Sequence, residues 1–339
     1  MRLSWEPLPL DLRTTFRIAH GASDRRDNVL VRLDEGLGEA AAVAYHGETP
    51  AGIMAYLAAV GDIWEDDPCL LEDVWARLPA GSAAARAAID IALHDVWGKR
   101  LGQPLYRLFG LNPARAPLTS FTIAMAAPEA MAEQAREAGL PIYKIKVGGA
   151  QDVAAVAAIR AVSPARLRVD ANAGWTREQA AALIPQLASY DLELVEQPLP
   201  VGDIEGLRWL KALGLGLPIF ADESIKTAWD VAAHAGAVDG VVIKLMKTGG
   251  IREALRAIHT AHALGMQVML SCMVESSVGV TAAAHLAPLC ELADLDGPLL
   301  VRNDPFTGVT YDGARLCLPD LPGIGVQKAL VTKLTLEYH

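Results

Sequence analysis

The chain has 339 residues, of which 52% are hydrophobic and 6% aromatic, and its formal net charge is −10 at pH 7. This length allows one large barrel or two domains, and the many alanines are typical of a helix-rich α/β enzyme. The acidic balance, without any run of lysine or arginine, argues against nucleic acid or an anionic membrane surface as a partner.

The chain shows no sign of export or of membrane insertion. Its start, MRLSWEPLPLDLRTTF, lacks the apolar core of a signal peptide, and no apolar run approaches the ~20 residues that a membrane span needs. The four cysteines are scattered without a CxxC or another paired spacing, which favours reduced thiols. We therefore expect a cytoplasmic protein that does not bind membranes.

The N-terminal region, residues 1–112, is expected to form an α+β unit. The segment NVLVRLDEG is typical of a strand and a turn. The longer segment GSAAARAAIDIALHDVWGKRLGQPLYRLFG is typical of a long helix followed by a turn.

In the central region, residues 113–300, short apolar segments alternate with alanine-rich ones that show helical spacing and a closing glycine, such as EAMAEQAREAG and IREALRAIHTAHALG. The predicted strands are 118–124, 143–147, 166–170, 192–196, 217–222, 240–244, 267–272 and 291–296. Eight strands joined by seven helices favour a parallel, closed (β/α)7β barrel, a variant of the TIM barrel. An open doubly wound sheet is the structural alternative, but no GxGxxG motif follows an early strand.

The C-terminal end of the chain is different again. The segment GPLLVRNDPFTGVTYDGARLCLPDLPGIGV is rich in Gly, Pro and Asp and predicts turns and short strands. We expect residues 301–339 to return to the N-terminal region and to form one α+β capping domain with it.

An ionisable residue closes each of five consecutive predicted strands. These residues are Lys146, Asp170, Glu196, Asp222 and Lys244, spaced 24, 26, 26 and 22 residues apart, one β/α unit each time. In a β/α barrel they would meet at the C-terminal rim, where such enzymes carry out their chemistry. A single such residue would be an ordinary charge in solvent. Five in the order cation, anion, anion, anion, cation indicate a divalent metal flanked by two lysines. Three carboxylates without His or Cys favour Mg²⁺, with Mn²⁺ as an alternative, over zinc.

A further lysine lies on the same strand face. In PIYKIKVGG, Lys144 precedes Lys146 by two residues, so the two side chains project the same way, roughly 7 Å apart. Like charges this close are costly, which indicates that the site uses them.

Five motifs resemble those of the enolase superfamily, and those of its muconate-cycloisomerase subgroup most closely. They are KIK at 144–146, VDANAGW at 169–175, VEQPL at 195–199, ADES at 221–224 and IKLMKTGG at 243–250. In addition, LADLDGP at 292–298 resembles the Asp-x-Asp motif of dipeptide epimerases of the L-Ala-D/L-Glu type. The mandelate-racemase subgroup fits poorly, because the predicted seventh strand does not end in a histidine. The resemblance covers nearly the whole chain.

The resemblance implies a Mg²⁺-dependent dipeptide epimerase of peptidoglycan peptide metabolism. Such an enzyme inverts the α-carbon of the C-terminal residue by two-base proton transfer through a metal-stabilised ene-diolate. Lys146 and Lys244 would be the acid/base catalysts, with Lys247 as a rival for the second position. The implied metal ligands are Asp170, Glu196 and Asp222, and the implied substrate-binding residues are Thr122, Lys144, Cys272, Val274, Asp294 and Asp296.

Two further features bear on the substrate. Asp294 and Asp296 are two apart on the predicted eighth strand, so they would share a face and attract the dipeptide's α-ammonium; an ordinary acidic turn is the alternative. The resemblance also implies that capping loops, residues 16–26 and 45–50, recognise the side chain. The arginine that related L-Ala-L-Glu epimerases carry in the first loop falls near His20 here.

Other functions stay open from the sequence. A cycloisomerase, an o-succinylbenzoate synthase or an N-succinylamino acid racemase would use the same metal and lysines without needing Asp294 and Asp296. A Schiff-base aldolase would use a strand-end lysine but not three carboxylates. A binding protein without catalysis is disfavoured, because every expected catalytic position is filled. The expected partner is a small-molecule substrate, and a homo-oligomer is compatible with the sequence.

Overall fold

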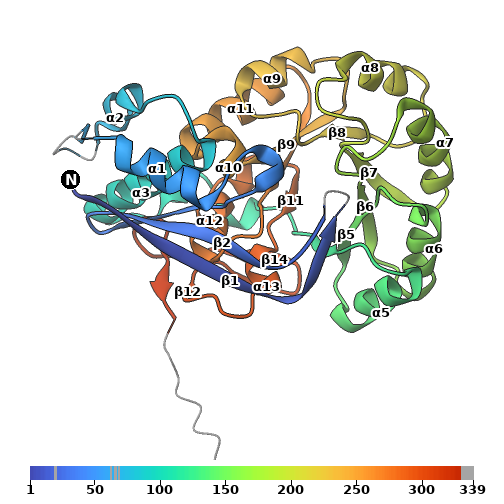
Figure 1. Ribbon diagram of the computed structural model, residues 1–339, viewed down its shortest axis with the longest axis horizontal. Helices are drawn as coiled ribbons and strands as arrows, with labels where there is room; N and C mark the ends of the chain where they lie inside the picture. The colour runs from blue at the N-terminus through green and yellow to red at the C-terminus, as the bar shows by residue number, and fades with distance from the viewer. Residues whose placement is uncertain (19–20, 62, 65–66, 68, 330–339) are drawn as a thin grey trace, which may run out of the picture.

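An eight-stranded parallel barrel forms the centre of the molecule (Figure 1). The computed structural model describes residues 1–18, 21–61, 63–64, 67 and 69–329. The barrel strands are β4 (Phe121–Ile123), β5 (Ile142–Lys146), β6 (Arg166–Asp170), β7 (Leu192–Glu196), β8 (Ile219–Ala221), β9 (Gly240–Lys244), β10 (Gln267–Ser271) and β11 (Leu292–Asp294). They follow one another in chain order, and a parallel bridge between Thr119 and Ala293 joins the two ends of the sheet. The predicted (β/α)7β barrel is confirmed.

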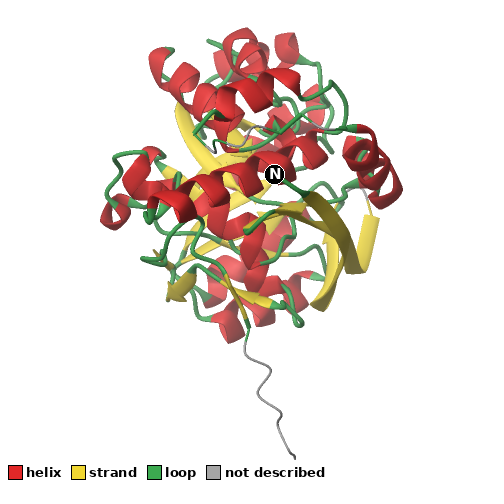
Figure 2. Ribbon diagram, turned by 90° about the vertical axis from the view of Figure 1, so that its left-hand side faces the viewer, coloured by secondary structure: helices red, strands yellow, loops and turns green. Residues whose placement is uncertain are grey.

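Each of the seven connections between barrel strands contains a helix, as predicted. These helices are α5 (Pro128–Ala138), α6 (Asp152–Val162), α7 (Arg177–Ala188), α8 (Ile204–Ala212), α9 (Ala228–Ala233), α10 (Leu245–Thr248), α11 (Ile251–Ala263) and α12 (Ser277–Ala284), followed by the short η3 (Ala287–Leu289). Local sequence sets where they begin: Thr176 and Gln179 form a capping box at the start of α7. The helices lie on the outside of the barrel, as both views show (Figures 1 and 2).

The N-terminal region forms a three-stranded antiparallel sheet and a set of helices. Its elements are β1 (Leu3–Ile18), β2 (Gly21–Leu33), β3 (Gly36–Ala40), η1 (Ala44–His46), α1 (Pro50–Ala59), α2 (Leu71–Arg77), α3 (Ala83–Leu101), α4 (Leu105–Leu108) and η2 (Pro113–Arg115). β3 packs directly on the long helix α3, and Gly38 allows this close approach. A Cβ atom at Gly38 would lie 1.9 Å from the carbonyl oxygen of Ala88.

The C-terminal segment runs back against the N-terminal sheet. It follows α13 (Gly297–Leu300) and contains β12 (Phe306–Thr307), β13 (Thr310–Asp312), β14 (Arg315–Cys317) and β15 (Gln327–Lys328). An antiparallel bridge links Val301 to Leu12 of β1, and the N–H of Leu105 donates to the carbonyl of Gly323. These contacts support our division into residues 1–112, 113–300 and 301–339, which stays a proposal.

Buried carboxylates attach the N-terminal region to the barrel. Glu39 on β3 accepts hydrogen bonds from the backbone N–H groups of Ser276 and Gly279, at the N-terminus of α12. Asp90 on α3 likewise accepts from the N–H of Ile251, the first residue of α11. A carboxylate is stabilised at a helix N-terminus by unpaired N–H groups and by the helix dipole. Two such contacts fix the cap over the barrel rim.

No helix in the described part of the chain has both the length and the apolar character that crossing a bilayer requires.

We predict that Gly38→Ala destabilises the protein by about 1–3 kcal/mol or more, because the added methyl must push β3 away from α3. Gly149→Ala is the control, since its Cβ would meet the flexible end of Met125 at 3.1 Å and Asp152 Oδ1 at an ordinary contact distance of 3.8 Å. Chemical denaturation of both variants would measure the difference. A Gly38→Ala protein as stable as the wild type would contradict this account of the packing.

Candidate active site

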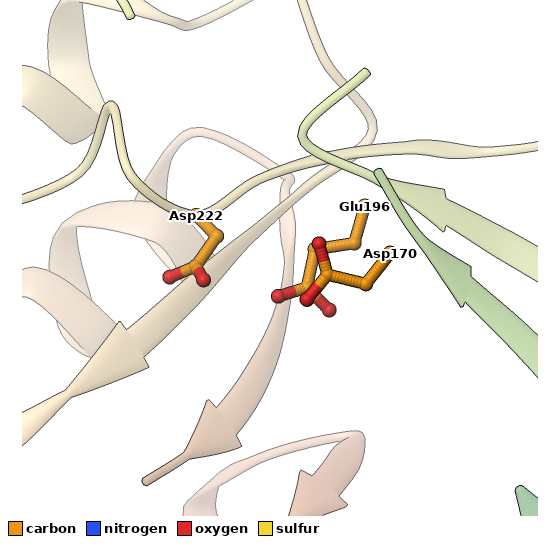
Figure 3. Close-up of side chains that lie close together, drawn as sticks. All are labelled: Asp170, Glu196 and Asp222. Atoms are coloured by element: carbon orange, nitrogen blue, oxygen red, sulfur yellow. The ribbon is translucent and has the colours of Figure 1, made fainter. Parts of the chain in front are cut away.

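Three carboxylates converge at the C-terminal rim of the barrel. Asp170 ends β6, Glu196 ends β7, and Asp222 directly follows β8. Asp170 and Glu196 are register partners on neighbouring strands. One oxygen from each of the three side chains lies within 4.8 Å of the others, and all three residues are buried (Figure 3). The structure therefore brings the predicted metal ligands together.

Buried lysines surround these carboxylates. Lys146 Nζ lies 2.6 Å from Asp170 Oδ2, and Lys244 Nζ lies 2.6 Å from Asp222 Oδ2. Because β5 and β9 are four strands apart in a ring of eight, the two lysines face each other across the barrel. Lys247, the rival candidate, lies in α10 and binds the backbone and side-chain oxygens of Asp222.

The charges in this cluster explain why it suits a cation. Burial favours the neutral form of Asp170, but Lys146 and Lys144 reverse this and hold its pKa below the usual value. For Glu196, burial and the nearby Asp170 raise the pKa well above the usual value. Each of the three acids lies beside a lysine, but the three carboxylates also repel one another, and a divalent ion among them would offset that repulsion. An all-oxygen, acidic set of this kind fits Mg²⁺.

The predicted catalytic and substrate-binding residues line one cavity of about 370 Å³ between the barrel rim and the N-terminal region. Barrel residues in its wall are Thr122, Lys144, Lys146, Lys244, Cys272, Val274, Asp294 and Asp296. Lys247 does not line this cavity but lies in the wall of a neighbouring one. Because Lys244 lines the same cavity as Lys146, on the opposite side, it is supported as the second catalyst.

The Asp-x-Asp motif differs from expectation in one respect. Asp294 ends β11, but Asp296 lies beyond the strand, directly before α13, so strand alternation does not place them together. The backbone N–H of Thr122 donates to Asp296 Oδ2 at 2.6 Å and holds it at the cavity instead. Burial and the nearby Asp294 raise the pKa of Asp296 to about 7.

The cap supplies the opposite wall through the two expected segments, but the described part of the first one, residues 16–18 and 21–26, lies on strands β1 and β2 and not in a loop. His20, the predicted specificity residue, lies outside the described residues. Of the neighbouring arginines, Arg25 pairs with Asp27 at 2.7 Å, whereas the guanidinium of Arg26 lies 6.0 Å from the ring centre of Phe16. Tyr45 also lines the cavity. The segments were expected here, but no pattern in the sequence singled out Phe16 or Tyr45.

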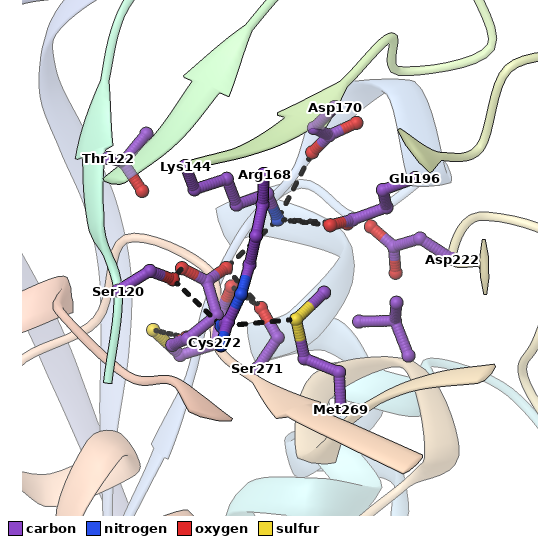
Figure 4. Close-up of polar contacts among 12 residues, drawn as sticks. Ser120, Thr122, Lys144, Arg168, Asp170, Glu196, Asp222, Met269, Ser271 and Cys272 are labelled. Carbon is purple, nitrogen blue, oxygen red and sulfur yellow. Dashed lines mark hydrogen bonds and ion pairs between the residues drawn. The ribbon is translucent and has the colours of Figure 1, made fainter. Parts of the chain in front are cut away.

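A polar network below the rim was missed from the sequence. Arg168 on β6 is buried and extends toward Ser120 and Met269 (Figure 4). Its guanidinium also donates to the carbonyl of Ala293 at 2.8 Å and to Glu193 at 2.7 Å. A signal was available, because Arg168 precedes Asp170 by two residues and so shares its inward face.

With this geometry described, the chain can be placed in a family. Residues 8–110 match the mandelate racemase / muconate lactonizing enzyme N-terminal domain, and residues 128–329 match the enolase C-terminal domain-like family. The chain therefore belongs to the mandelate racemase / muconate lactonizing enzyme family of the enolase superfamily.

Its relatives within that family include dipeptide epimerases. The L-Ala-D/L-Glu epimerase of Bacteroides thetaiotaomicron is 40% identical, over 97% of this chain and 88% of its own. A substrate-liganded L-Ala-D/L-Glu epimerase from Bacillus subtilis superposes with a TM-score of 0.91 at 32% identity, covering 97% of this chain and 99% of that one. A dipeptide epimerase from Enterococcus faecalis, complexed with Mg and L-Leu-L-Tyr, gives 0.90 at 35% identity, covering 96% and 99%.

We predict that Mg²⁺ stabilises the protein against unfolding by ~2.7 kcal/mol when present at 100-fold its Kd. Asp222→Asn should remove most of this effect, because it deletes one ligand charge. Glu205→Gln is the control, since Glu205 is exposed on α8. Thermal unfolding with and without Mg²⁺ measures the effect directly. Equal stabilisation of both variants would rule out the acidic triad as the site.

Proposed function

We propose that this chain is a Mg²⁺-dependent dipeptide epimerase that inverts the α-carbon of the C-terminal residue. The observation that carries the proposal is the placement of Lys146 and Lys244 on opposite sides of one cavity, with the acidic triad between them. The names of the relatives support the same reaction.

In the proposed reaction, the two lysines exchange protons with the two faces of the α-carbon. One lysine, as the free amine, takes the α-proton, and the opposite lysine, as the ammonium, donates a proton to the other face. Substrate and product carry the same number of protons. Each lysine returns to its starting protonation state by exchanging a proton with solvent. Mg²⁺ held by Asp170, Glu196 and Asp222 would supply positive charge at the substrate carboxylate, which makes the α-proton more acidic.

The acidic pair argues for a substrate with a free amine. Asp294 and Asp296 both line the cavity, and their negative charge suits the α-ammonium of a dipeptide. A cycloisomerase, an o-succinylbenzoate synthase or an N-succinylamino acid racemase handles substrates without that ammonium and has no use for the pair. Membership of this family gives no support to the alternative function of a Schiff-base aldolase. A cytoplasmic location and a homo-oligomeric state stay predictions.

We predict that incubation of free dipeptides with the protein and Mg²⁺ in D₂O yields the epimer with one added deuterium, because the returned proton comes from a solvent-exchanged lysine. Mass spectrometry of an L-Xaa-L-Yaa library detects the +1 Da product and ranks the side chains. The matched control is the same library with N-acetylated amines. Exchange of N-succinyl amino acids but not of free dipeptides would move the function to the racemase branch.

We predict that Lys146→Ala and Lys244→Ala each lower the rate of epimerisation by at least the ~10²–10⁴-fold typical of losing a positioned acid or base. Each variant should still exchange the α-hydrogen of one substrate epimer through its remaining lysine. Chiral separation combined with deuterium incorporation distinguishes the two processes. Normal epimerisation by Lys244→Ala, with a dead Lys247→Ala, would show that the second base was assigned wrongly.

A further inference from the structure

The backbone of Asp222 is held differently from that of the other two acids of the triad. Asp170 and Glu196 end their strands as register partners of each other, so the sheet fixes both. The ladder between β8 and β9 stops at the pair of Ala221 and Val241, one residue before Asp222. The orientation of Asp222 must therefore come from contacts outside the sheet.

Two buried side chains supply those contacts. The side-chain oxygen of Gln197 accepts from the backbone N–H of Asp222 at 2.9 Å. The Lys247 ammonium donates to the backbone carbonyl of Asp222 and to its Oδ1 oxygen. It also donates to the carbonyl of Val242 on β9, at 3.1 Å. Lys247 thus joins β8 to β9 just beyond the point where their ladder ends.

Lys247 uses its donors in a different way from the two proposed catalysts. An ammonium has three N–H donors, and Lys247 has three acceptors for them. Lys146 and Lys244 each donate to one carboxylate oxygen, at 2.6 Å, and the described residues offer neither of them a second acceptor. Both line the substrate cavity, so their remaining donors can reach a ligand there. Lys247 has no donor left for a substrate.

We propose that Lys247 is a positioning residue that orients Asp222 toward the metal ion and takes no part in proton transfer. This inference rests on the metal site of the proposed function. Lys247 engages Oδ1 of Asp222, whereas Lys244 engages Oδ2. With Oδ1 and the backbone carbonyl held, Asp222 keeps its orientation when Lys244 leaves Oδ2 for the substrate.

Loss of Lys247 would change the site in two ways that act in opposite directions. Removal of a positive charge beside Asp222 would by itself favour the binding of a cation. Loss of a partner that directs a ligating carboxylate lowers metal affinity, typically about 10- to 100-fold. The direction of the change in Mg²⁺ affinity therefore distinguishes a positioning residue from a mere neighbouring charge.

The test measures Mg²⁺ binding without substrate, by isothermal titration calorimetry, in the wild type, Lys247→Met and Lys226→Met. Lys247→Met should raise the Kd for Mg²⁺ about 10- to 100-fold. Lys226→Met is the matched control, because Lys226 is exposed in the wall of the same second cavity and forms no ion pair with any described residue, and its Kd should equal that of the wild type. An unchanged or lower Kd in Lys247→Met, or an equal rise in Lys226→Met, would overturn the proposal.

The Mg²⁺ dependence of activity separates positioning from proton transfer. In Lys247→Met, epimerisation should require more Mg²⁺ but recover most of the wild-type kcat at saturating Mg²⁺, and exchange of the α-hydrogen should return for both epimers together. Added metal cannot replace a lost base. If exchange of one epimer stays lost at saturating Mg²⁺, Lys247 takes part in proton transfer and the proposal is wrong.

A milder variant keeps the test open if Lys247→Met fails to fold. Lys247→Gln retains N–H donors on a shorter, uncharged side chain, which cannot satisfy all three acceptors. Its Kd for Mg²⁺ should still exceed that of the wild type, and an unchanged Kd would refute the positioning role.

The inference and the proposed function can fail separately. A wild type that binds Mg²⁺ but exchanges no α-hydrogen of any free dipeptide overturns the function, while a raised Kd in Lys247→Met still supports the positioning role. A wild type that epimerises free dipeptides, together with an unchanged Kd in Lys247→Met, overturns the positioning role alone.

Discussion

The pairing of buried lysines with buried carboxylates is the interaction on which the site depends. Ionised groups inside a protein are costly unless each has a partner, and the loss of one partner leaves an uncompensated charge. Here Lys144, Lys146 and Lys244 each bind a carboxylate at the end of a barrel strand. The parallel barrel makes this possible, because it brings the carboxyl ends of all its strands to one rim.

Buried carboxylates also attach the cap to the barrel, but their partners are backbone N–H groups at helix N-termini. Burial raises the pKa of Glu39 and of Asp90, and the N–H groups at the starts of α12 and α11 oppose that shift. The helices that the cap binds directly follow β10 and α10, close to Ser271 and Lys247. The cap is therefore docked beside the rim. A cavity with walls from both parts can then exclude water from the lysines.

The barrel and the rim residues could be predicted because the strands are short and largely apolar, and because an ionisable residue closes each of five consecutive predicted strands. Strand β1 could not be predicted, because Pro7 and Pro9 interrupt its pattern. The two prolines are tolerated in the structure since β1 lies at the edge of its sheet. Asp296 was expected on a strand, but the strand ends at Asp294, and a tertiary contact with Thr122 positions it. Contacts between distant segments leave no local pattern. The partners of Arg168 could not be predicted for the same reason, although its inward position follows from its spacing of two residues from Asp170.

The geometry of the site assigns each substituent of the proposed substrate a direction. In the proposed reaction, the substrate carboxylate would lie at the acidic triad, the two faces of the α-carbon would face Lys146 and Lys244, and the amine end would point to Asp294 and Asp296. The side chain of the epimerised residue is then left to face the cap wall, where Phe16 and Arg26 lie. Because Phe16 lies on β1 and Arg26 on β2, outside the barrel, substitutions there can change which side chain fits without moving either lysine. The fold thus separates selection of the substrate from the chemistry performed on it.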